Sequence, residues 1–433
     1  MSVPAARMLL VTHGTDGDVL PFIRLGGALR ELGHEVTLLT HSPFRERAAA
    51  AGLEFVPIDT PDGYERYSAD TALLPGGLGT LDWQEFYRRN DLFGQLALEY
   101  RALAERVRPG RTVLVGRHTS ALSVLLARES LGVPAAWVAV APIQPLAAGV
   151  ARHLYQHTLA GGIDEVRGRF GLPPVTDWPA WFSSADLRIG LWPEWFDRAG
   201  PATGDGSLLA GFPLPDDRDE PLPPAAAALL DGPLRPVLVT GGTGRMVHPD
   251  FYRAALAGCR LAGRPVLLVV PHEELIPRPL PPEVAWFPRL PFRAAMPKVA
   301  AVLHHGGIGT LTRALAAGTP QVILAHGADR PDNAARLAGE GLSRWLPDFR
   351  WGPAEVAGAL RAALEDGRRP ALTGSAEAAD GLAAAAGHLS ALIGRTPERV
   401  AGPPSARLAA LHGARRRALA ARLRERLAER GAP

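Results

Sequence analysis

The chain has 433 residues, 47% of them hydrophobic and 21% charged, which is an ordinary globular composition with material for two or three domains. Lysine and arginine number 47 against 44 acidic residues, and the net charge of only +3 argues against a dedicated nucleic-acid-binding protein. The single cysteine, Cys259, excludes an intramolecular disulfide and fits a reducing, cytoplasmic setting. No apolar run approaches the roughly 18 residues of a membrane span, and no signal peptide is expected at the N-terminus.

The first half of the chain alternates strand-like apolar runs with helical periodicity. Residues 8–12 predict a buried strand, residues 14–18 a glycine-rich turn, and residues 22–32 a helix that ends at Gly33. Further strands are expected at 36–40, 53–58, 112–115 and 135–140, and helices at 44–51 and 119–131. This alternation predicts right-handed crossovers and a parallel sheet.

A proline-rich stretch with an acidic run at 216–220 is interpreted as an interdomain linker. The alternation then restarts, with strands expected at 237–240, 265–270, 299–303 and 321–324 and helices at 250–261, 309–317 and 332–339. The sequence therefore predicts an α/β protein with two Rossmann-like, doubly wound parallel-sheet domains and a cleft between them. The predicted boundaries are 1–215 for the first domain, 216–235 for the linker, 236–400 for the second domain and 401–433 for a basic C-terminal helix.

The segment from Ala301 to Thr310 carries the most chemistry. A buried strand ends at a turn of two histidines and two glycines, His304 to Gly307, and a helix begins at about Gly309. Unpaired N–H groups at a helix start carry partial positive charge, and glycines let a phosphate approach the backbone closely. Histidine beside such a turn can donate a hydrogen bond, so a nucleoside diphosphate is the expected ligand.

Three segments extend this pattern into a family signature. His-His-Gly-Gly-Ile-Gly-Thr at 304–310 is followed by Ala-Gly-Thr-Pro-Gln at 317–321 and by Asp-Arg-Pro-Asp-Asn-Ala at 329–334. These runs resemble the donor-binding signature of family 1 glycosyltransferases, and Gly-Thr-Asp-Gly-Asp-Val-Leu-Pro at 14–21 resembles the N-terminal loop of the same family. The nearest subgroup is that of bacterial macrolide, glycopeptide and rhamnolipid-type enzymes.

The resemblance implies a GT-B fold with an N-terminal acceptor lobe and a C-terminal donor lobe. It implies a UDP- or TDP-linked sugar as co-substrate, inversion at the anomeric carbon, no cofactor and no metal. Asp16 and Asp18 have the spacing of an Asp-x-Asp metal motif, but they belong to the acceptor-side loop. The expected acceptor is an apolar small molecule, natural product or lipid, and a lipid acceptor would add a peripheral membrane contact. Oligomeric state is left open.

Donor roles are carried over residue by residue within the glycine turn. His305 aligns with the histidine that contacts the β-phosphate, and His304 is the alternative because some relatives keep only that one. Gly306 and Gly307 are the glycines of the turn that is expected to bind the diphosphate. Gly309 and Thr310 are expected to contact the α-phosphate.

The remaining donor residues lie outside that turn. Asp329 aligns with the acid that binds sugar hydroxyls, a role compatible with capping a helix. Arg330 stands where the family commonly has glutamine, which favours a carboxylate-bearing sugar unless the side chain points away. Gly242 and Thr243 resemble the second donor loop, and Arg289 lies where the base is usually held.

Inversion by direct displacement needs a base on the acceptor lobe. Asp18 is the predicted base, because it aligns with the position that is histidine in plant relatives and aspartate in many bacterial ones. The competing interpretations are that Asp18 only caps a helix, or that His13 is the base. Plant enzymes pair their histidine with an aspartate after the fourth strand, whereas this chain has Gly116-Arg117-His118 there, with no acid.

Two other functions remain open at this stage. One is a catalytically silent, nucleotide-sugar-binding auxiliary protein, and the other is a GT-B-like sugar epimerase. A nicotinamide dehydrogenase is disfavoured because the first turn lacks a Gly-x-Gly-x-x-Gly fingerprint. Tryptophans at 178, 181, 192 and 195 are either core residues or the lining of an apolar acceptor pocket.

Overall fold

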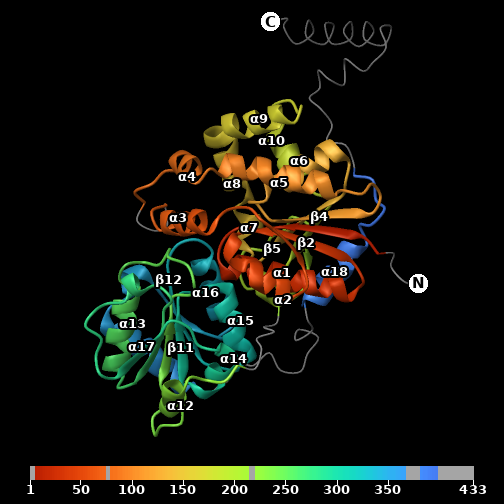
Figure 1. Ribbon diagram of the computed structural model, residues 1–433. Coiled ribbons are helices and arrows are strands. Elements are labelled where there is room, and N and C mark those ends of the chain that lie inside the picture. The colour runs from red at the N-terminus through yellow and green to blue at the C-terminus, as the bar shows by residue number, and fades with distance from the viewer. Residues whose placement is uncertain (1–4, 75–78, 214–219, 367–380, 398–433) are drawn as a thin grey trace, which may run out of the picture.

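The computed structural model describes residues 5–74, 79–213, 220–366 and 381–397, which form two α/β lobes (Figure 1). The first sheet has seven strands in the order β3-β2-β1-β4-β5-β6-β7, and the second has six in the order β10-β9-β8-β11-β12-β13. The recorded strand pairs are parallel. Both sheets therefore have doubly wound topology, as the sequence predicts.

The strands and helices of the first lobe follow one another in the predicted alternation. Its strands are β1 (Arg7–Val11), β2 (Glu35–Thr40), β3 (Glu54–Pro57), β4 (Thr112–Arg117), β5 (Ala135–Ala139), β6 (Leu187–Gly190) and β7 (Leu208–Leu209). Its helices are α1 (Asp16–Glu31), α2 (Arg45–Ala50), α3 (Pro61–Thr71), α4 (Trp83–Arg89), α5 (Leu92–Arg106), α6 (Leu122–Leu131), α7 (Ile143–Leu146), α8 (Ala148–Leu154), α9 (Ala160–Arg169), α10 (Trp178–Phe182) and α11 (Glu194–Arg198).

The second lobe repeats the pattern. Its strands are β8 (Val237–Thr240), β9 (Val266–Val269), β10 (Val284–Phe287), β11 (Ala301–His304), β12 (Gln321–Ala325) and β13 (Arg344–Pro347). Its helices are α12 (Pro224–Leu230), α13 (Phe251–Leu261), α14 (Phe292–Ala295), α15 (Ile308–Ala316), α16 (Arg330–Gly339) and α17 (Pro353–Glu365). Part of the stretch interpreted as a linker is thus the helix α12, whose Ala226 and Leu230 pack in the core of this lobe.

Each sheet is covered on both faces, which is why its strands are nearly continuous apolar runs. One face of the first sheet packs against α5, α6 and α9, and the other against α1. Trp178 and Trp181 belong to the first of these cores and Trp192 to a core between the lobes, so these three are packing residues. The second sheet packs against α13 and α17 on one face and α12 on the other.

A separate hydrophobic core joins the two lobes. It combines the last residue of β5 and side chains that follow β6 and β7 in the first lobe with side chains of α15, β12 and α16 in the second. Its fully buried members include Trp192, Phe196, Leu311 and Leu337. This core packs one lobe against the other.

Helix α18 (Gly381–Ser390) packs on the first lobe although the predicted boundary put residues up to 400 in the second (Figure 1). Leu382, Leu389 and Leu392 join the core beside α1, and Ser390 Oγ lies 2.8 Å from His34 Nε2. The chain after the second sheet therefore returns to the first lobe. The basic helix expected at 401–433 lies outside the described residues.

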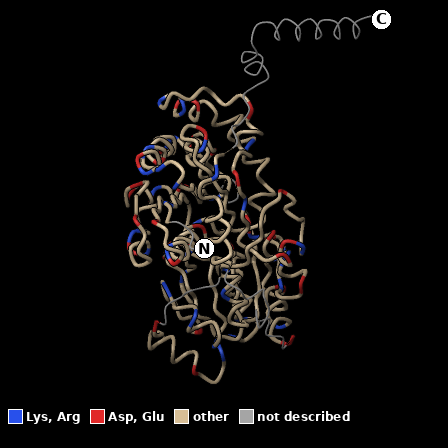
Figure 2. Tube along the Cα trace, turned by 90° about the vertical axis from the view of Figure 1, so that its right-hand side faces the viewer, with Lys and Arg blue, Asp and Glu red and all other residues tan. Residues whose placement is uncertain are grey.

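The surface carries both signs of charge, and acidic and basic positions are interspersed over both lobes along the trace (Figure 2). None of the helices in the described ranges is both long and apolar enough to cross a membrane.

Candidate active site

The carboxyl ends of the central strands carry the predicted site residues. In a doubly wound sheet the crevice opens where the strand order reverses, which is between β1 and β4 in the first lobe and between β8 and β11 in the second. Asp18 lies in the first turn of α1 after β1, and Arg117 is the last residue of β4, whereas Gly242 and His305 lie in the loops after β8 and β11. Topology therefore accounts for why residues far apart in the sequence lie at the same edge of each sheet.

Asp18 lies in the first turn of α1, which begins six residues earlier than the sequence pattern predicted. Its Oδ2 accepts a hydrogen bond from the Thr15 N–H at 3.1 Å, half of a capping box. Gly14, with φ of +118°, precedes it, and a Cβ there would collide with Asp18 Oδ2. The turn therefore needs glycine for its backbone conformation and for the space that the carboxylate fills.

Arg117, the last residue of β4, holds the other oxygen of this carboxylate. Its Nη2 donates to Asp18 Oδ1 at 2.6 Å, and its Nη1 donates to Ser120 Oγ at 3.2 Å. Thr119 between them has φ of +67°, a left-handed conformation that is rare for a β-branched residue. The end of β4 thus presents a cation to Asp18, next to a strained residue of the loop that follows.

His13 is engaged at both ring nitrogens. Nε2 lies 2.7 Å from Glu99 Oε1 and Nδ1 lies 3.2 Å from Ser120 Oγ. Glu99 is buried on α5; burial alone would raise the pKa of its carboxyl, but His13 and hydrogen bonds from Ser123 and Gln95 hold that pKa below its ordinary value. Sequence inspection missed Glu99, because it precedes β4 and no motif marks it.

The two adjacent histidines of the donor turn have different surroundings. His304 is fully buried: its Nδ1 accepts from the Gly306 N–H at 3.2 Å, and its Nε2 lies 3.0 Å from Gln321 Oε1. Burial lowers the pKa of His304 to about 4, so the ring is neutral and donates to Gln321. Both ring nitrogens are used within the protein, which makes His304 a packing residue of this turn.

His305 is partly exposed and lies between two glycines. A Cβ on Gly242 would lie 2.7 Å from its Cε1, and a Cβ on Gly307 would lie 2.5 Å from its Nε2. Within the described part of the chain, Nδ1 of His305 is buried and has no hydrogen-bond partner. Burial also lowers the pKa of His305 well below its ordinary value, with Arg330 acting in the same direction. The ring is thus a neutral polar group with an unused hydrogen-bonding atom.

The N-terminus of α15 follows at once. Gly307 is its N-cap and has no side chain to cap it, so the N–H groups of Ile308 and Gly309 remain directed out of the helix. A Cβ on Gly309 would meet only Arg313 Nη1, at 3.4 Å, whereas Thr310 is 8% exposed and lies against the core. The helix start is a general anion site.

Asp329 and Arg330 lie at the N-terminus of α16. Asp329 occupies the N-cap position without capping the helix; instead its Oδ2 accepts from Asn333 Nδ2 at 2.8 Å. Burial raises the pKa of Asp329 and lowers that of Arg330. Ala328, immediately before them, has φ of +53°, which is unfavourable for a residue with a Cβ. Arg330 donates to the His326 carbonyl at 3.3 Å.

Of the other predicted donor residues, Thr243 lies in the loop after β8, next to the glycine turn in the sheet, and Arg289 lies farther away. The carbonyl of Thr243 is 3.0 Å from His272 Nε2. Arg289 follows β10, which is separated from β11 by the two strands β9 and β8; its side chain is 72% exposed and pairs with Glu220 at 3.1 Å. Among the described contacts, none joins Arg289 to the glycine turn.

One ion pair and two further observations show that the lobes lie close together here. A Cβ on Gly244 would lie 3.4 Å from Thr15 Cγ2, and Arg245 forms an ion pair with Glu65 of α3 at 2.5 Å. The negative charge of Asp18 also acts on Asp329, whose pKa it raises. A carboxylate on one lobe therefore faces an anion site and a polar pair on the other.

Comparison with known proteins agrees with this architecture. The chain matches the N-terminal domain of glycosyltransferase family 28 over residues 8–90 and the C-terminal domain of the erythromycin biosynthesis protein CIII-like family over residues 266–386. A crystal structure of the kitacinnamycin glycotransferase has a TM-score of 0.65 at 18% identity, covering 90% of this chain and 100% of that one. The fold class is therefore GT-B, as predicted.

The chain belongs to the bacterial natural-product glycosyltransferases of this fold. O-mycaminosyltylonolide 6-deoxyallosyltransferase of Streptomyces fradiae is 30% identical over 402 residues, covering 83% of this chain and 90% of that protein. Vancomycin aglycone glucosyltransferase of Amycolatopsis orientalis is 29% identical over 367 residues, covering 77% and 84% respectively. The predicted family, with its macrolide and glycopeptide members, is confirmed.

Proposed function

We propose that this cytoplasmic glycosyltransferase is an inverting, metal-independent hexosyltransferase with Asp18 as its general base. It transfers a sugar from a TDP- or UDP-linked donor to a hydroxyl group of an apolar natural-product or lipid acceptor. The observation that supports the proposal is that the Asp18 carboxylate on the first lobe lies near enough to Asp329 and Arg330 on the second for its charge to act on the pKa of both. A sugar held on the donor lobe would present its anomeric carbon to an acceptor oxygen beside Asp18.

The choice of Asp18 over His13 rests on which group has capacity to accept a proton. Both ring nitrogens of His13 already have side-chain partners, and one of them is the buried Glu99. Each oxygen of Asp18 has one partner, from Arg117 or Thr15, and a carboxylate has about four acceptor positions. Asp18 can thus accept the hydrogen bond of an incoming hydroxyl while Arg117 and Thr15 keep it oriented.

Donor recognition would use His305 in preference to His304. The partly exposed ring of His305 and the N–H groups of Ile308 and Gly309 would supply donors to a diphosphate without a cation. TDP is favoured as the carrier because a relative that is 25% identical over 389 residues is a dTDP-epi-vancosaminyltransferase. Arg330, beside Asp329, would favour a neutral or acidic sugar and oppose a cationic amino sugar.

The test uses the purified full chain with a panel of TDP- and UDP-linked sugars. A matched donor at about 100 times its Kd should stabilise the protein by roughly 2.7 kcal/mol in a thermal-shift measurement. With that donor and a hydroxylated aromatic acceptor, Asp18→Asn should lower turnover by on the order of a hundredfold or more while the thermal shift persists. The anomeric configuration of the product, determined by NMR, should be opposite to that of the donor.

Asp16→Asn is the matched control, because Asp16 lies on the same turn but pairs with Arg47 at 2.8 Å. It should retain near wild-type turnover. Full turnover in Asp18→Asn would remove Asp18 as the base. Donor binding with neither transfer nor slow hydrolysis would instead support a silent auxiliary protein, and an isomerised labelled donor would support an epimerase.

A further inference from the structure

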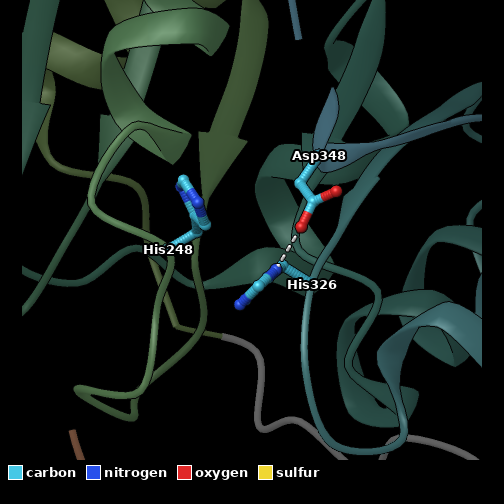
Figure 3. Close-up of side chains that lie close together, drawn as sticks. All are labelled: His248, His326 and Asp348. Carbon is cyan, nitrogen blue, oxygen red and sulfur yellow. Dashed lines mark hydrogen bonds and ion pairs between the residues drawn. The ribbon is translucent and has the colours of Figure 1, made fainter. Parts of the chain in front are cut away.

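Three potential metal ligands meet on the second lobe at the carboxyl edge of its sheet. His248 lies in the loop between β8 and α13, His326 follows β12, and Asp348 follows β13 (Figure 3). One ligand atom from each side chain can be chosen so that all three lie within 4.8 Å of one another. The three residues come from separate loops, so their meeting is a property of the fold and not of a local sequence motif.

The cluster is already partly organised. His326 Nδ1 lies 2.6 Å from Asp348 Oδ2, and the rings of His248 and His326 are edge to face with centroids 4.7 Å apart (Figure 3). The ring of His248 also packs against Trp351, at 5.1 Å between centroids. The side chains of His326 and Asp348 are 25% and 39% exposed, so an ion can reach them from solvent.

Two imidazoles and one carboxylate suit zinc better than a hard cation such as Mg²⁺, which prefers oxygen ligands throughout. Zinc–ligand bonds of about 2.0–2.1 Å put the ligand atoms of a tetrahedral site about 3.3 Å apart. The widest separation would have to close by up to about 1.5 Å, and the hydrogen-bonded atoms His326 Nδ1 and Asp348 Oδ2, 2.6 Å apart, would have to separate if both bind the ion. Rotation of these partly exposed side chains can provide both movements. Three protein ligands leave the fourth position to water.

We propose that His248, His326 and Asp348 form a zinc-class transition-metal site that ties together the two loops flanking the donor. The loop with His248 also carries Gly242 and Thr243, and the loop with His326 leads directly into Asp329 and Arg330. An ion held between them restrains both loops in the arrangement seen here. It takes no part in the transfer step itself, for which the N-terminus of α15 and His305 provide the anion contacts.

The experiment measures metal binding by the full chain after chelator treatment, with neither donor nor acceptor present. Zn²⁺ is titrated in competition with a chromogenic chelator, and one ion per chain is expected at this site. His248→Gln and Asp348→Asn should each weaken that binding by about tenfold or more. Amide hydrogen exchange in residues 241–250 and 326–330 should slow when Zn²⁺ is added to the wild type and stay unchanged in His248→Gln. Mg²⁺ at the same concentration should have neither effect.

The control removes a different pair of histidines. His153 and His157 are exposed on the first lobe, with tilted rings whose centroids lie 4.3 Å apart, and they are an alternative place for a surface ion. The double variant His153→Asn/His157→Asn should keep the zinc affinity and the exchange protection of the wild type. Zinc binding that survives His248→Gln, or is lost in the control, would overturn the assignment, as would the lack of stoichiometric binding by the wild type.

Discussion

In the turn at residues 304–307, a shift of one residue along the chain decides whether a histidine side chain is buried in the core or lies in the loop. His304 is the last residue of β11, so its side chain enters the core and both its nitrogens are bonded to Gln321 and Gly306. His305 is the first residue of the loop, and its ring lies between Gly242 and Gly307. The sequence offered both as phosphate ligands, because an apolar run does not mark the residue at which a strand ends.

His304 should make the protein less stable in mild acid. Its pKa is about 4 in the folded chain and about 6.5 when unfolded, so between these values the unfolded chain binds more protons. The stability that the neutral ring contributes is present above pH 6.5 and is lost as the pH falls towards 4. The free energy of unfolding in urea should fall between pH 7 and pH 5 by about 2 kcal/mol less in His304→Gln than in the wild type. An identical pH dependence of the two proteins would contradict this account.

At the scale of elements, two loops on the donor lobe keep backbone conformations that ordinary side chains disfavour. Gly242 has φ of +79°, and Gly327 and Ala328 have φ of +67° and +53°. Left-handed conformations cost an alanine roughly 1–2 kcal/mol. Ala328 bears that cost immediately before Asp329, which places strain where the donor sugar is proposed to bind.

Gly242→Ala should therefore impair the donor site in two ways. The new Cβ is strained at positive φ and also meets the ring of His305 at 2.7 Å, so the ring must move. Gly263→Ala is a matched control, since Gly263 has φ of +66° in the same lobe but open space around its Cβ. Both variants should lower Tm. Only Gly242→Ala should also weaken the affinity for TDP or UDP, by about tenfold or more, which would be seen as a smaller thermal shift with the nucleotide. Equal nucleotide affinity in the two variants would show that His305 does not contribute.

The elements differ in how far the sequence predicts them. Helical and strand periodicity locates the alternating elements and the doubly wound class, because buried parallel strands must be apolar. The periodicity places the start of α1 after Pro21, because proline usually marks a helix boundary. In the structure, Thr15 and Asp18 cap a longer helix that contains Pro21. The pairs Asp18–Arg117 and His13–Glu99 join residues 99 and 86 positions apart. No local pattern encodes such distances, and only the folded topology brings these residues together.

At the scale of the whole molecule, the cleft depends on how the lobes are held. Arg336 on α16 is 1% exposed and crosses from the second lobe to the first. Its guanidinium donates to the carbonyls of Phe196, Asp197 and Pro201 at 2.5–3.0 Å, and its Nε donates to Asp332 at 2.8 Å. One side chain thus satisfies three buried or half-buried carbonyls beside the interlobe core. Helix α18 adds a second connection, because the chain returns from the second lobe to pack on α1.

Arg336→Leu should loosen the arrangement of the lobes more than any loss of apolar contact would. The leucine keeps part of the packing volume but leaves three carbonyls and Asp332 without their donor, which costs about 3–5 kcal/mol when a buried charged partner is removed. Urea unfolding followed by tryptophan fluorescence should show a lower midpoint and separate transitions for the two lobes, since the interlobe core would couple them more weakly without the hydrogen bonds of Arg336. Arg344→Leu is the control: Arg344 is 47% exposed and, among the described contacts, its side chain pairs with Asp366 near the surface, so about 1 kcal/mol or less is expected. If Arg336→Leu unfolded in a single transition at the wild-type midpoint, the interlobe core alone would be sufficient to hold the cleft.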